Sequence, residues 1–235
     1  MAEPFLSSYG DDLRVAIVGA SGGVGGALAD LLDAAPNVAR LRRLSRKEGS
    51  MALDLTDEES IAAAARELGA LDVVICAAGL LHDEDAAPEK TWAALDPAAM
   101  TKVMATNAIG PALLAKHFLP LLPKGRKTVF AALSARVGSI GDNRLGGWVS
   151  YRASKAALNQ VIRTFSVELA RKRPEALIVG LHPGTVDTGL SKPFQRGHEL
   201  FSPEQSARHL LTVLDNLTPA DSGGVFAWDG GRIPE

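Results

Sequence analysis

Short apolar runs alternate with stretches of helical periodicity along most of this 235-residue chain. Most of the apolar runs lack the polar alternation of a half-exposed strand, which indicates strands buried on both faces of a sheet. Such runs lie at residues 14–19, 39–44, 51–55, 71–77, 127–133, 176–182 and 225–228. Apolar residues at helical spacing predict helices at residues 24–35, 58–68, 97–122, 149–172 and 203–214.

The order of these elements predicts an α/β fold, because apolar strands separated by amphipathic helices form parallel sheets with helices on both faces. The sequence shows neither an internal repeat nor a low-complexity linker. We therefore predict a single domain over residues 1–235, a Rossmann-type doubly wound parallel sheet of about seven strands. The connection from Leu44 to Met51 is too short to carry a crossover helix.

Composition and charge exclude several classes of function. The net charge is −2, so no basic field exists to drive binding to nucleic acid or to a membrane surface. Cys76 is the one cysteine, which excludes an internal disulfide framework, and His82 and the acids after it show no metal-ligand spacing. The start of the chain shows no secretory signal, and its most apolar early stretch, residues 15–29, is too short to span a bilayer. We expect a cytoplasmic protein with no metal, no nucleic-acid partner and no membrane partner.

A glycine-rich turn stands where the first strand ends and the first helix begins. It reads Gly19-Ala20-Ser21-Gly22-Gly23-Val24-Gly25. Glycines permit a tight turn and close backbone approach, and the free N–H groups at a helix start attract a pyrophosphate. The turn predicts a dinucleotide phosphate site, and a glycine-rich turn without a ligand is the alternative.

The spacing of these glycines resembles that of the short-chain dehydrogenase/reductases, and further motifs of that family follow in order over residues 14–228. Tyr151-Arg152-Ala153-Ser154-Lys155 matches the Tyr-x-x-x-Lys motif, and Asn107 stands where the family has its helix asparagine. Cys76-Ala77-Ala78-Gly79 stands where the family often has Asn-Asn-Ala-Gly. Pro183-Gly184-Thr185-Val186-Asp187-Thr188 resembles the segment that meets the nicotinamide. Residues 134–143 and 226–230 resemble the branch of C-factor and the sniffer-like carbonyl reductases.

The resemblance implies an NAD(P)-dependent oxidoreductase that transfers hydride between a nicotinamide cofactor and a small carbonyl or alcohol substrate. It implies catalytic roles for Tyr151, Lys155, Asn107 and Ser134. It implies a cofactor site made of Gly19, Ser21, Gly22, Gly23, Val24, Gly25, Ser45, Arg46, Asp54, Leu55, Ala77, Ala78, Gly79, Tyr151, Lys155, Pro183, Gly184, Val186 and Thr188. A short substrate lid is expected near residues 189–203.

Tyr151 and Lys155 are four residues apart and so share one face of the predicted helix. An ammonium beside a phenol favours the phenolate, so we expect a tyrosine that exchanges its proton near neutral pH. By resemblance, Tyr151 protonates the carbonyl oxygen, while Lys155 also holds the ribose hydroxyls. Without the other motifs, the two residues would be interpreted as an ordinary helix-surface pair.

Asn107 lies on the apolar stripe of its predicted helix, together with Met100, Val103 and Met104. Pro111, four residues later, has no N–H to bond the carbonyl of residue 107. The helix should therefore kink and leave that carbonyl free, and in the family the corresponding carbonyl holds a water that passes protons toward the lysine. A satisfied core amide is the alternative for this side chain.

The choice of cofactor depends on the end of the second strand, where a carboxylate favours NAD and an arginine favours NADP. Ser45 and Arg46 stand there, with no acid before Glu48, so we predict NADP over NAD. A solvated surface charge is the alternative for Arg46. By resemblance Asp54 contacts the adenine, and a turn or helix-start aspartate is its alternative.

The match to the family fails at the catalytic serine. Counting back from Gly138 and Tyr151 places Ala135 in that position and Ser134 one residue before it. Ala135 has no group to hydrogen-bond a substrate oxygen, so Ser134 or Ser139 would have to serve, or turnover would be slow. A nucleotide-binding signalling or interaction protein with weak or no turnover, as the C-factor resemblance allows, is therefore the alternative function.

A homodimer or homotetramer is expected, because family members usually pair through the helices that correspond to residues 97–122 and 149–172. These helices also carry more apolar residues than one face against a sheet requires, among them Leu113, Leu114, Phe118 and Phe165. This apolar surplus supports the same prediction.

Overall fold

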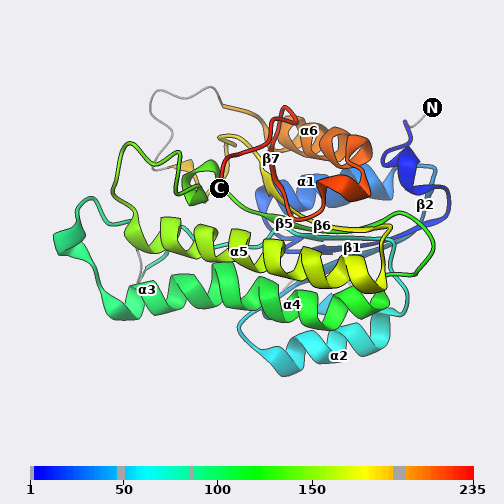
Figure 1. Cartoon of the computed structure of the whole chain (residues 1–235), viewed down its shortest axis with the longest axis horizontal. Helices are drawn as coiled ribbons and strands as arrows, with labels where there is room; N and C mark the ends of the chain where they lie inside the picture. Colours follow the sequence, from blue (N-terminus) through cyan, green and yellow to red (C-terminus); the bar gives the residue numbers. More distant parts are fainter. Residues whose placement is uncertain (1–2, 47–50, 85–86, 193–199) are drawn as a thin grey trace.

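The computed structural model describes residues 3–46, 51–84, 87–192 and 200–235, built around a seven-stranded sheet (Figure 1). The strand order is β3-β2-β1-β4-β5-β6-β7, and every neighbouring pair is parallel. The strands are β1 (Leu13–Val18), β2 (Val38–Ser45), β3 (Met51–Ala52), β4 (Val73–Cys76), β5 (Thr128–Leu133), β6 (Ala176–His182) and β7 (Val225–Ala227). The predicted doubly wound parallel sheet is confirmed.

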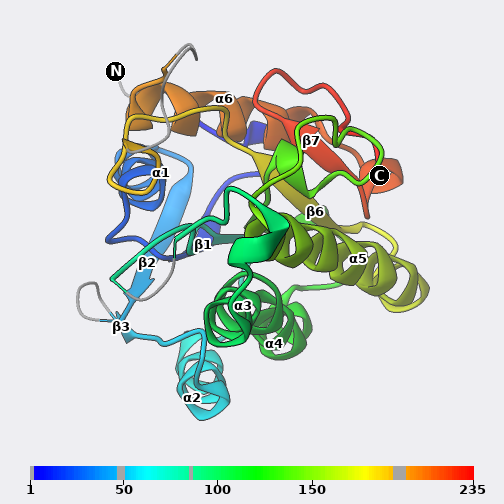
Figure 2. The ribbon, with the colours of Figure 1, turned by 90° about the vertical axis from the view of Figure 1, so that its left-hand side faces the viewer.

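Helices cover both faces of this sheet, as Figure 2 shows. One face is covered by α1 (Gly23–Asp33) and α6 (Pro203–Asn216), and the other by α2 (Glu58–Leu68), α4 (Gly110–Phe118) and α5 (Val149–Lys172). The remaining helix, α3 (Pro97–Met104), runs toward α4 and packs against α5. No helix among the described residues is long and apolar enough to cross a bilayer.

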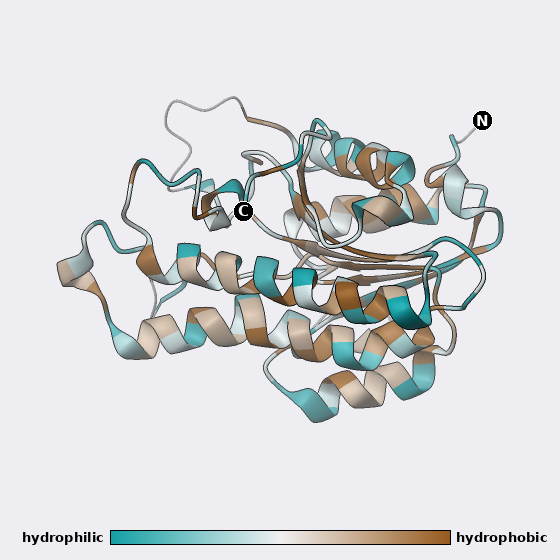
Figure 3. Cartoon of the chain, viewed as in Figure 1, coloured by the Kyte–Doolittle hydropathy of each residue, from teal (hydrophilic) through white to brown (hydrophobic). Residues whose placement is uncertain are grey.

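Strand β1 shows why the strands read as continuous apolar runs. Val15 and Ile17 belong to the core under α1 and α6, while Ala16 and Val18 belong to the core under α2, α4 and α5. All four are buried, since successive side chains of a strand point to opposite faces and both faces carry helices. In Figure 3 the strands inside the molecule are hydrophobic, whereas the helices mix hydrophobic and hydrophilic residues.

The long helix predicted over residues 97–122 is interrupted where the proline argument placed a kink. A π-helical turn, Ala105–Ile109, separates α3 from α4, and the N–H of Gly110 donates to the carbonyl of Ala105, five residues back. Pro111 follows directly and has no N–H to continue the α-helical pattern. The backbone hydrogen bonding therefore departs from the α-helical pattern in the region where the kink was predicted, in the form of a π turn.

Strand β3 is shorter than the predicted run 51–55. Only Met51 and Ala52 pair with β2, after which the N–H of Leu53 donates to the carbonyl of Ser45. The carboxylate of Asp54 then accepts hydrogen bonds from the N–H and the hydroxyl of Thr56, both at 2.8 Å. This turn directs the chain into α2 and ends the strand early.

The apolar surplus on the long helices is smaller than the sequence suggested. Leu114 and Phe118 are fully buried in the chain's own core under α2, α4 and α5. Leu113 and Phe165 are partly buried and pack against that same core. The expectation that these four side chains leave apolar surface for a partner is therefore wrong for Leu114 and Phe118, because they are buried in one core with residues of the sheet, α2 and α5.

Leu114→Ala is expected to lower the free energy of unfolding by about 2–5 kcal/mol, because the side chain is fully buried and its removal leaves a cavity. Leu113→Ala, at the partly buried neighbouring position, is the matched control and should cost clearly less. Denaturant unfolding of both variants measures the difference. Equal losses of unfolding free energy in the two variants would contradict the assignment of Leu114 to the core and Leu113 to its edge.

Candidate active site

The predicted site residues gather at the carboxyl edge of the sheet. Strand register places Val18 beside Cys76, Cys76 beside Ala132, and Leu133 beside Leu181. The loops that leave β1, β4, β5 and β6 therefore begin next to one another. The strand order also reverses between β1 and β4, and doubly wound sheets bind their ligands at such a reversal.

The glycine turn lies at this reversal and needs its glycines. Gly19 has φ of +85°, and a Cβ atom there would lie 2.7 Å from the backbone nitrogen of Ala78. A Cβ atom on Gly25 would collide with the carbonyl of Gly19. The first turn of α1 has Gly22 as its cap, with no side-chain cap and no acid, so its N–H groups are open to an anion.

The segment of residues 183–188 lies over the same helix start. A Cβ atom on Gly23 would touch the methyl group of Thr188. The hydroxyl of Ser206 in α6 donates to the carbonyl of Pro183 at 2.8 Å. Gly184 has φ of +77°, and a Cβ atom there would lie 2.7 Å from the ring of Phe201. The segment is thus held between α1, α6 and an aromatic side chain.

Lys155 is buried and reaches the end of β5. Its Nζ donates to the carbonyl of Leu133 at 2.7 Å and lies 5.7 Å from the centre of the Tyr151 ring. A Cβ atom built on Gly79 would lie 3.6 Å from Lys155 Nζ and 3.4 Å from Asn107 Oδ1. The structure therefore brings Tyr151, Lys155 and Asn107 together around the loop that follows β4.

Burial shifts the pKa values of both residues of the Tyr–Lys pair toward their neutral forms. It raises the pKa of Tyr151 to about 12 and lowers the pKa of Lys155 to about 8. The expectation that the ammonium brings the tyrosine pKa toward neutrality is not met in the chain alone. Desolvation of the phenol dominates, and the lysine directs a hydrogen bond to Leu133.

The side chain of Asn107 is a fully satisfied amide. Its Oδ1 accepts from the N–H of Leu80 at 2.7 Å, and its Nδ2 donates to the carbonyl of Leu80 at 2.7 Å. The same Nδ2 donates to the hydroxyl of Ser154 at 3.1 Å. Asn107 thus ties the π turn, the loop after β4 and α5 together. The sequence pattern did not predict the hydrogen bond to Ser154, although Ser154 lies within the Tyr-x-x-x-Lys motif.

The hydroxyl of Ser134 is buried and has a partner on α5. Its hydroxyl donates at 2.6 Å to Oδ1 of Asn159, which lies one helical turn beyond Lys155 and two beyond Tyr151. The hydroxyl of Ser139 accepts from the N–H of Asp142 at 3.1 Å and so stabilises a turn. Both hydroxyls therefore have partners within the chain, and the catalytic role of Ser134 stays a prediction.

The adenine end of the predicted cofactor site follows β2 and β3. Ser45 is buried at the end of β2, and Arg46 comes next and is exposed. Hydrogen bonds from Thr56 lower the pKa of Asp54, and the charge of Arg46 acts in the same direction. Arg46 and Asp54 are therefore electrostatic neighbours, and Asp54 also plays the turn-forming role that was its alternative. Leu55 is buried beside it.

The predicted lid at residues 189–203 is described in part, because residues 193–199 lie outside the described residues. Its far end is anchored where Phe201 forms a bridge with Val186, and the N–H of Phe201 donates to the carbonyl of Thr185 at 3.0 Å. Phe201 therefore pairs with the segment of residues 183–188.

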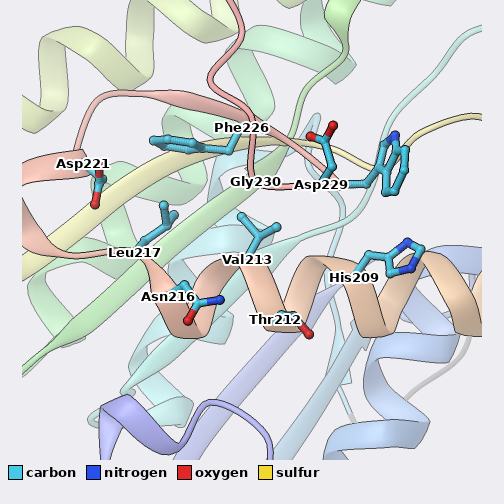
Figure 4. A pocket seen from close by; sticks show the side chains of 10 residues that line it. His209, Thr212, Val213, Asn216, Leu217, Asp221, Phe226, Asp229 and Gly230 are labelled. Atoms are coloured by element: carbon cyan, nitrogen blue, oxygen red, sulfur yellow. The ribbon is translucent and has the colours of Figure 1, made fainter.

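A separate cavity of about 500 Å³ lies between α6 and the chain around β7 (Figure 4). His209, Val213, Phe226, Trp228 and Asp229 are among its lining residues. None of the predicted catalytic or cofactor residues lines it. Among the described residues, no group of three or more histidines, cysteines and acids could hold a metal ion.

The doubly wound sheet and the open helix start at its reversal, with a buried Tyr–Lys pair nearby, form the arrangement at which α/β proteins of this topology bind dinucleotides. The sequence profile of the short chain dehydrogenases matches residues 14–199. This protein therefore belongs to the short-chain dehydrogenase family.

Individual relatives agree with this assignment. The chain is 37% identical over 182 residues to 1-hydroxy-2-glutathionyl-2-methyl-3-butene dehydrogenase of Rhodococcus sp. (strain AD45), and the match covers 76% of each sequence. It is 37% identical over 170 residues to C-signal of Myxococcus xanthus, a match that covers 71% of this chain and 93% of C-signal. The structure of NADPH-bound carbonyl reductase from chicken fatty liver superposes with a TM-score of 0.83 at 27% identity, over 100% of both chains. The resemblance to the C-factor and carbonyl reductase branch is confirmed.

Gly19→Ala is expected to destabilise the protein, because the new methyl group would press on the backbone of Ala78 at a positive φ. Gly69→Ala is the matched control, since Gly69 has φ of +68° and no atom within 4 Å of an added Cβ. In the control, the free energy of unfolding should fall only by the cost of a left-handed backbone for a residue with a Cβ atom, about 1–2 kcal/mol. Denaturant unfolding measures the free energy of unfolding of both variants. Equal losses would contradict the close approach of the loop after β1 to the loop after β4.

Proposed function

We propose that this protein is an NADP-dependent reductase of small carbonyl compounds. The observation that carries the proposal is the grouping of Tyr151, Lys155 and Asn107 around Gly79, at the strand edge where doubly wound proteins bind nucleotides. The similarity to a carbonyl reductase that binds NADPH and to a bacterial dehydrogenase supports it.

The residues present fit a nicotinamide dinucleotide. The open N–H groups at the start of α1 suit its pyrophosphate, and Ser45 and Arg46 would hold a 2′-phosphate. Asp54 and Leu55 would flank the adenine. The nicotinamide half would lie between residues 77–79 and residues 183–188, which the structure brings to one edge of the sheet. The bound cofactor supplies the hydride.

The chain's own residues supply the proton. Burial raises the pKa of Tyr151 to about 12, so the phenol is protonated at neutral pH and donates to the carbonyl oxygen as negative charge develops there. The pKa of Lys155, about 8, leaves most of the ammonium charged at pH 7, where it holds the ribose and polarises the phenol. A protonated tyrosine favours reduction over alcohol oxidation.

The group that stabilises the substrate oxygen is the weak part of the site. Ala135 stands where the family has a serine, and the hydroxyl of Ser134 is engaged by Asn159. Loss of one such donor lowers turnover by ~10²–10³-fold, so we infer a slow reductase. A nucleotide-binding signalling or interaction protein is the second candidate function, which this weakness and the similarity to C-signal favour.

NADPH is expected to bind more tightly than NADH, because Arg46 offers a cation to the 2′-phosphate at a position with no carboxylate. Titration of both cofactors, followed by nucleotide fluorescence, measures the difference. Arg46→Ala should remove most of this difference, whereas Arg42→Ala, a change at an arginine within β2, should retain it. Equal affinities in the unmodified protein would refute NADP preference.

Tyr151→Phe is expected to lower carbonyl-reductase turnover by ~10²–10⁴-fold, because the variant keeps the ring and loses the proton donor. Cofactor affinity should change little. Tyr9→Phe is the matched control, since the Tyr9 hydroxyl donates to Leu214 far along the chain from the Tyr–Lys motif. Absence of Tyr151-dependent turnover with every small carbonyl tested would favour the binding-protein alternative.

We also propose a homodimer or homotetramer formed through α4 and α5. Ile109, which is 54% exposed, and Val167, which is 46% exposed, are the large apolar side chains that the region of these helices leaves open. Light scattering at micromolar concentration should give at least twice the monomer mass. Val167→Glu should reduce that mass, and a monomer in the unmodified protein would refute the assembly.

A further inference from the structure

Helix α5 begins with an unusual backbone. Gly146, Gly147 and Trp148 have φ of +64°, +65° and +55°, so three successive residues before the helix adopt left-handed conformations. Trp148 is the cap residue, and no side-chain hydrogen bond comes from it to the first turn. A bulky residue in this conformation costs about 1–2 kcal/mol, so other contacts must hold the turn in place.

Those contacts come from Glu89, a buried residue in the connection between β4 and α3. Its backbone carbonyl accepts from the N–H of Trp148 at 2.6 Å. Its two carboxylate oxygens lie 3.2 and 3.3 Å from the N–H of Ser150, and one of them accepts from the Ser150 hydroxyl. A residue sixty-one positions away in the chain therefore caps α5.

The charge of Glu89 suits this position. Helix starts carry a partial positive charge and unpaired N–H groups, so a carboxylate there is stabilised by both. A buried carboxylate without such donors would be costly, and here Ser150 supplies both a backbone N–H and a hydroxyl. The Glu89 carboxylate therefore accepts hydrogen bonds from the first turn of α5, and these hydrogen bonds offset the cost of burying its charge.

The capped turn leads directly to the tyrosine. Ser150 precedes Tyr151, and the ring of Trp148 packs edge-on against the Tyr151 ring, with centroids 6.2 Å apart. On the outer side, Arg152 donates to the carbonyls of Gly147 at 2.9 Å and Gly146 at 3.2 Å. Glu89 and Arg152 thus both hold the turn by hydrogen bonds. Glu89 is the buried one, and its partner Ser150 is adjacent to Tyr151 in the sequence.

We propose that Glu89 is a positioning residue for Tyr151, which it acts on through Ser150 and the left-handed Trp148. Its effect on turnover rests on the proposed reductase function, whereas its effect on the tyrosine ring does not. Loss of the carboxylate frees the first turn of α5, and displacement of a catalytic group by about 1 Å lowers turnover by ~10²-fold.

The tyrosine content of the chain allows a direct test. The protein has two tyrosines, so NMR of protein labelled with ¹³C at tyrosine Cζ gives two signals, assigned with Tyr9→Phe. Glu89→Ala should shift or broaden the Tyr151 signal and leave the Tyr9 signal in place. Asp57→Ala, which removes the carboxylate that caps α2 through the N–H of Glu59, is the matched control and should move neither signal.

Kinetics provide the second measurement. Glu89→Ala should lower kcat by ~10²-fold with the Kd for NADPH unchanged, and Glu89→Gln, which keeps an oxygen acceptor for Ser150, should restore most of kcat. Asp57→Ala should keep kcat unchanged. If Glu89→Ala does not fold, Ser150→Ala replaces it and should shift the Tyr151 signal in a folded protein.

Three results would overturn the inference. They are an unmoved Tyr151 signal in Glu89→Ala, an equal shift in Asp57→Ala, or unchanged kcat in a Glu89→Ala variant of an active enzyme. If the unmodified protein reduces no carbonyl, the proposed function fails, and the tyrosine signals alone then decide whether Glu89 positions the ring.

Discussion

The hydrogen bond from the buried Nζ of Lys155 to the carbonyl of Leu133 is the interaction on which the site depends. An amine removed from water needs hydrogen-bond acceptors, and the carbonyl of Leu133 at the end of β5 provides one at 2.7 Å. The lysine reaches it because Gly138, where a Cβ would lie 2.7 Å from Lys155 Cβ, allows close contact. Gly79 leaves space around Nζ on the other side. One side chain thereby fixes α5 relative to β5 and the loop after β4.

The same burial decides the chemistry that the site favours. Desolvation shifts the pKa of Lys155 down and the pKa of Tyr151 up, so each group is biased toward its uncharged form. The proton therefore resides on the phenol across the neutral range, which suits a proton donor. Asn107 adds no charge, and its amide instead joins the π turn to Leu80 and Ser154. Tyr151, Lys155 and Asn107 are thus largely removed from water and held in place by contacts between segments.

Much of this arrangement follows from local sequence. Strands such as Val15 to Val18 read as apolar throughout because helices cover both faces, so periodicity alone predicts the fold. The helical spacing of Tyr151 and Lys155 places them on one face, and the missing N–H of Pro111 predicts a departure from α-helical geometry around Asn107. Each of these inferences involves residues within one or two turns of each other. The covalent chain determines such relations before any packing occurs.

Contacts between distant segments were decided by the tertiary structure. The sequence left Ser134 open as a catalytic group, but packing of β5 against α5 directs its hydroxyl to Asn159. Nothing in the pattern around Glu89 indicates that it caps α5, because its partner Ser150 comes sixty-one residues later. The pKa direction of Tyr151 also depends on how completely other segments exclude water from it. Sequence thus determined the fold and the identity of the motifs through local periodicity and backbone chemistry. The tertiary structure decided partners and protonation, because these depend on desolvation and on distances between segments far apart in the chain.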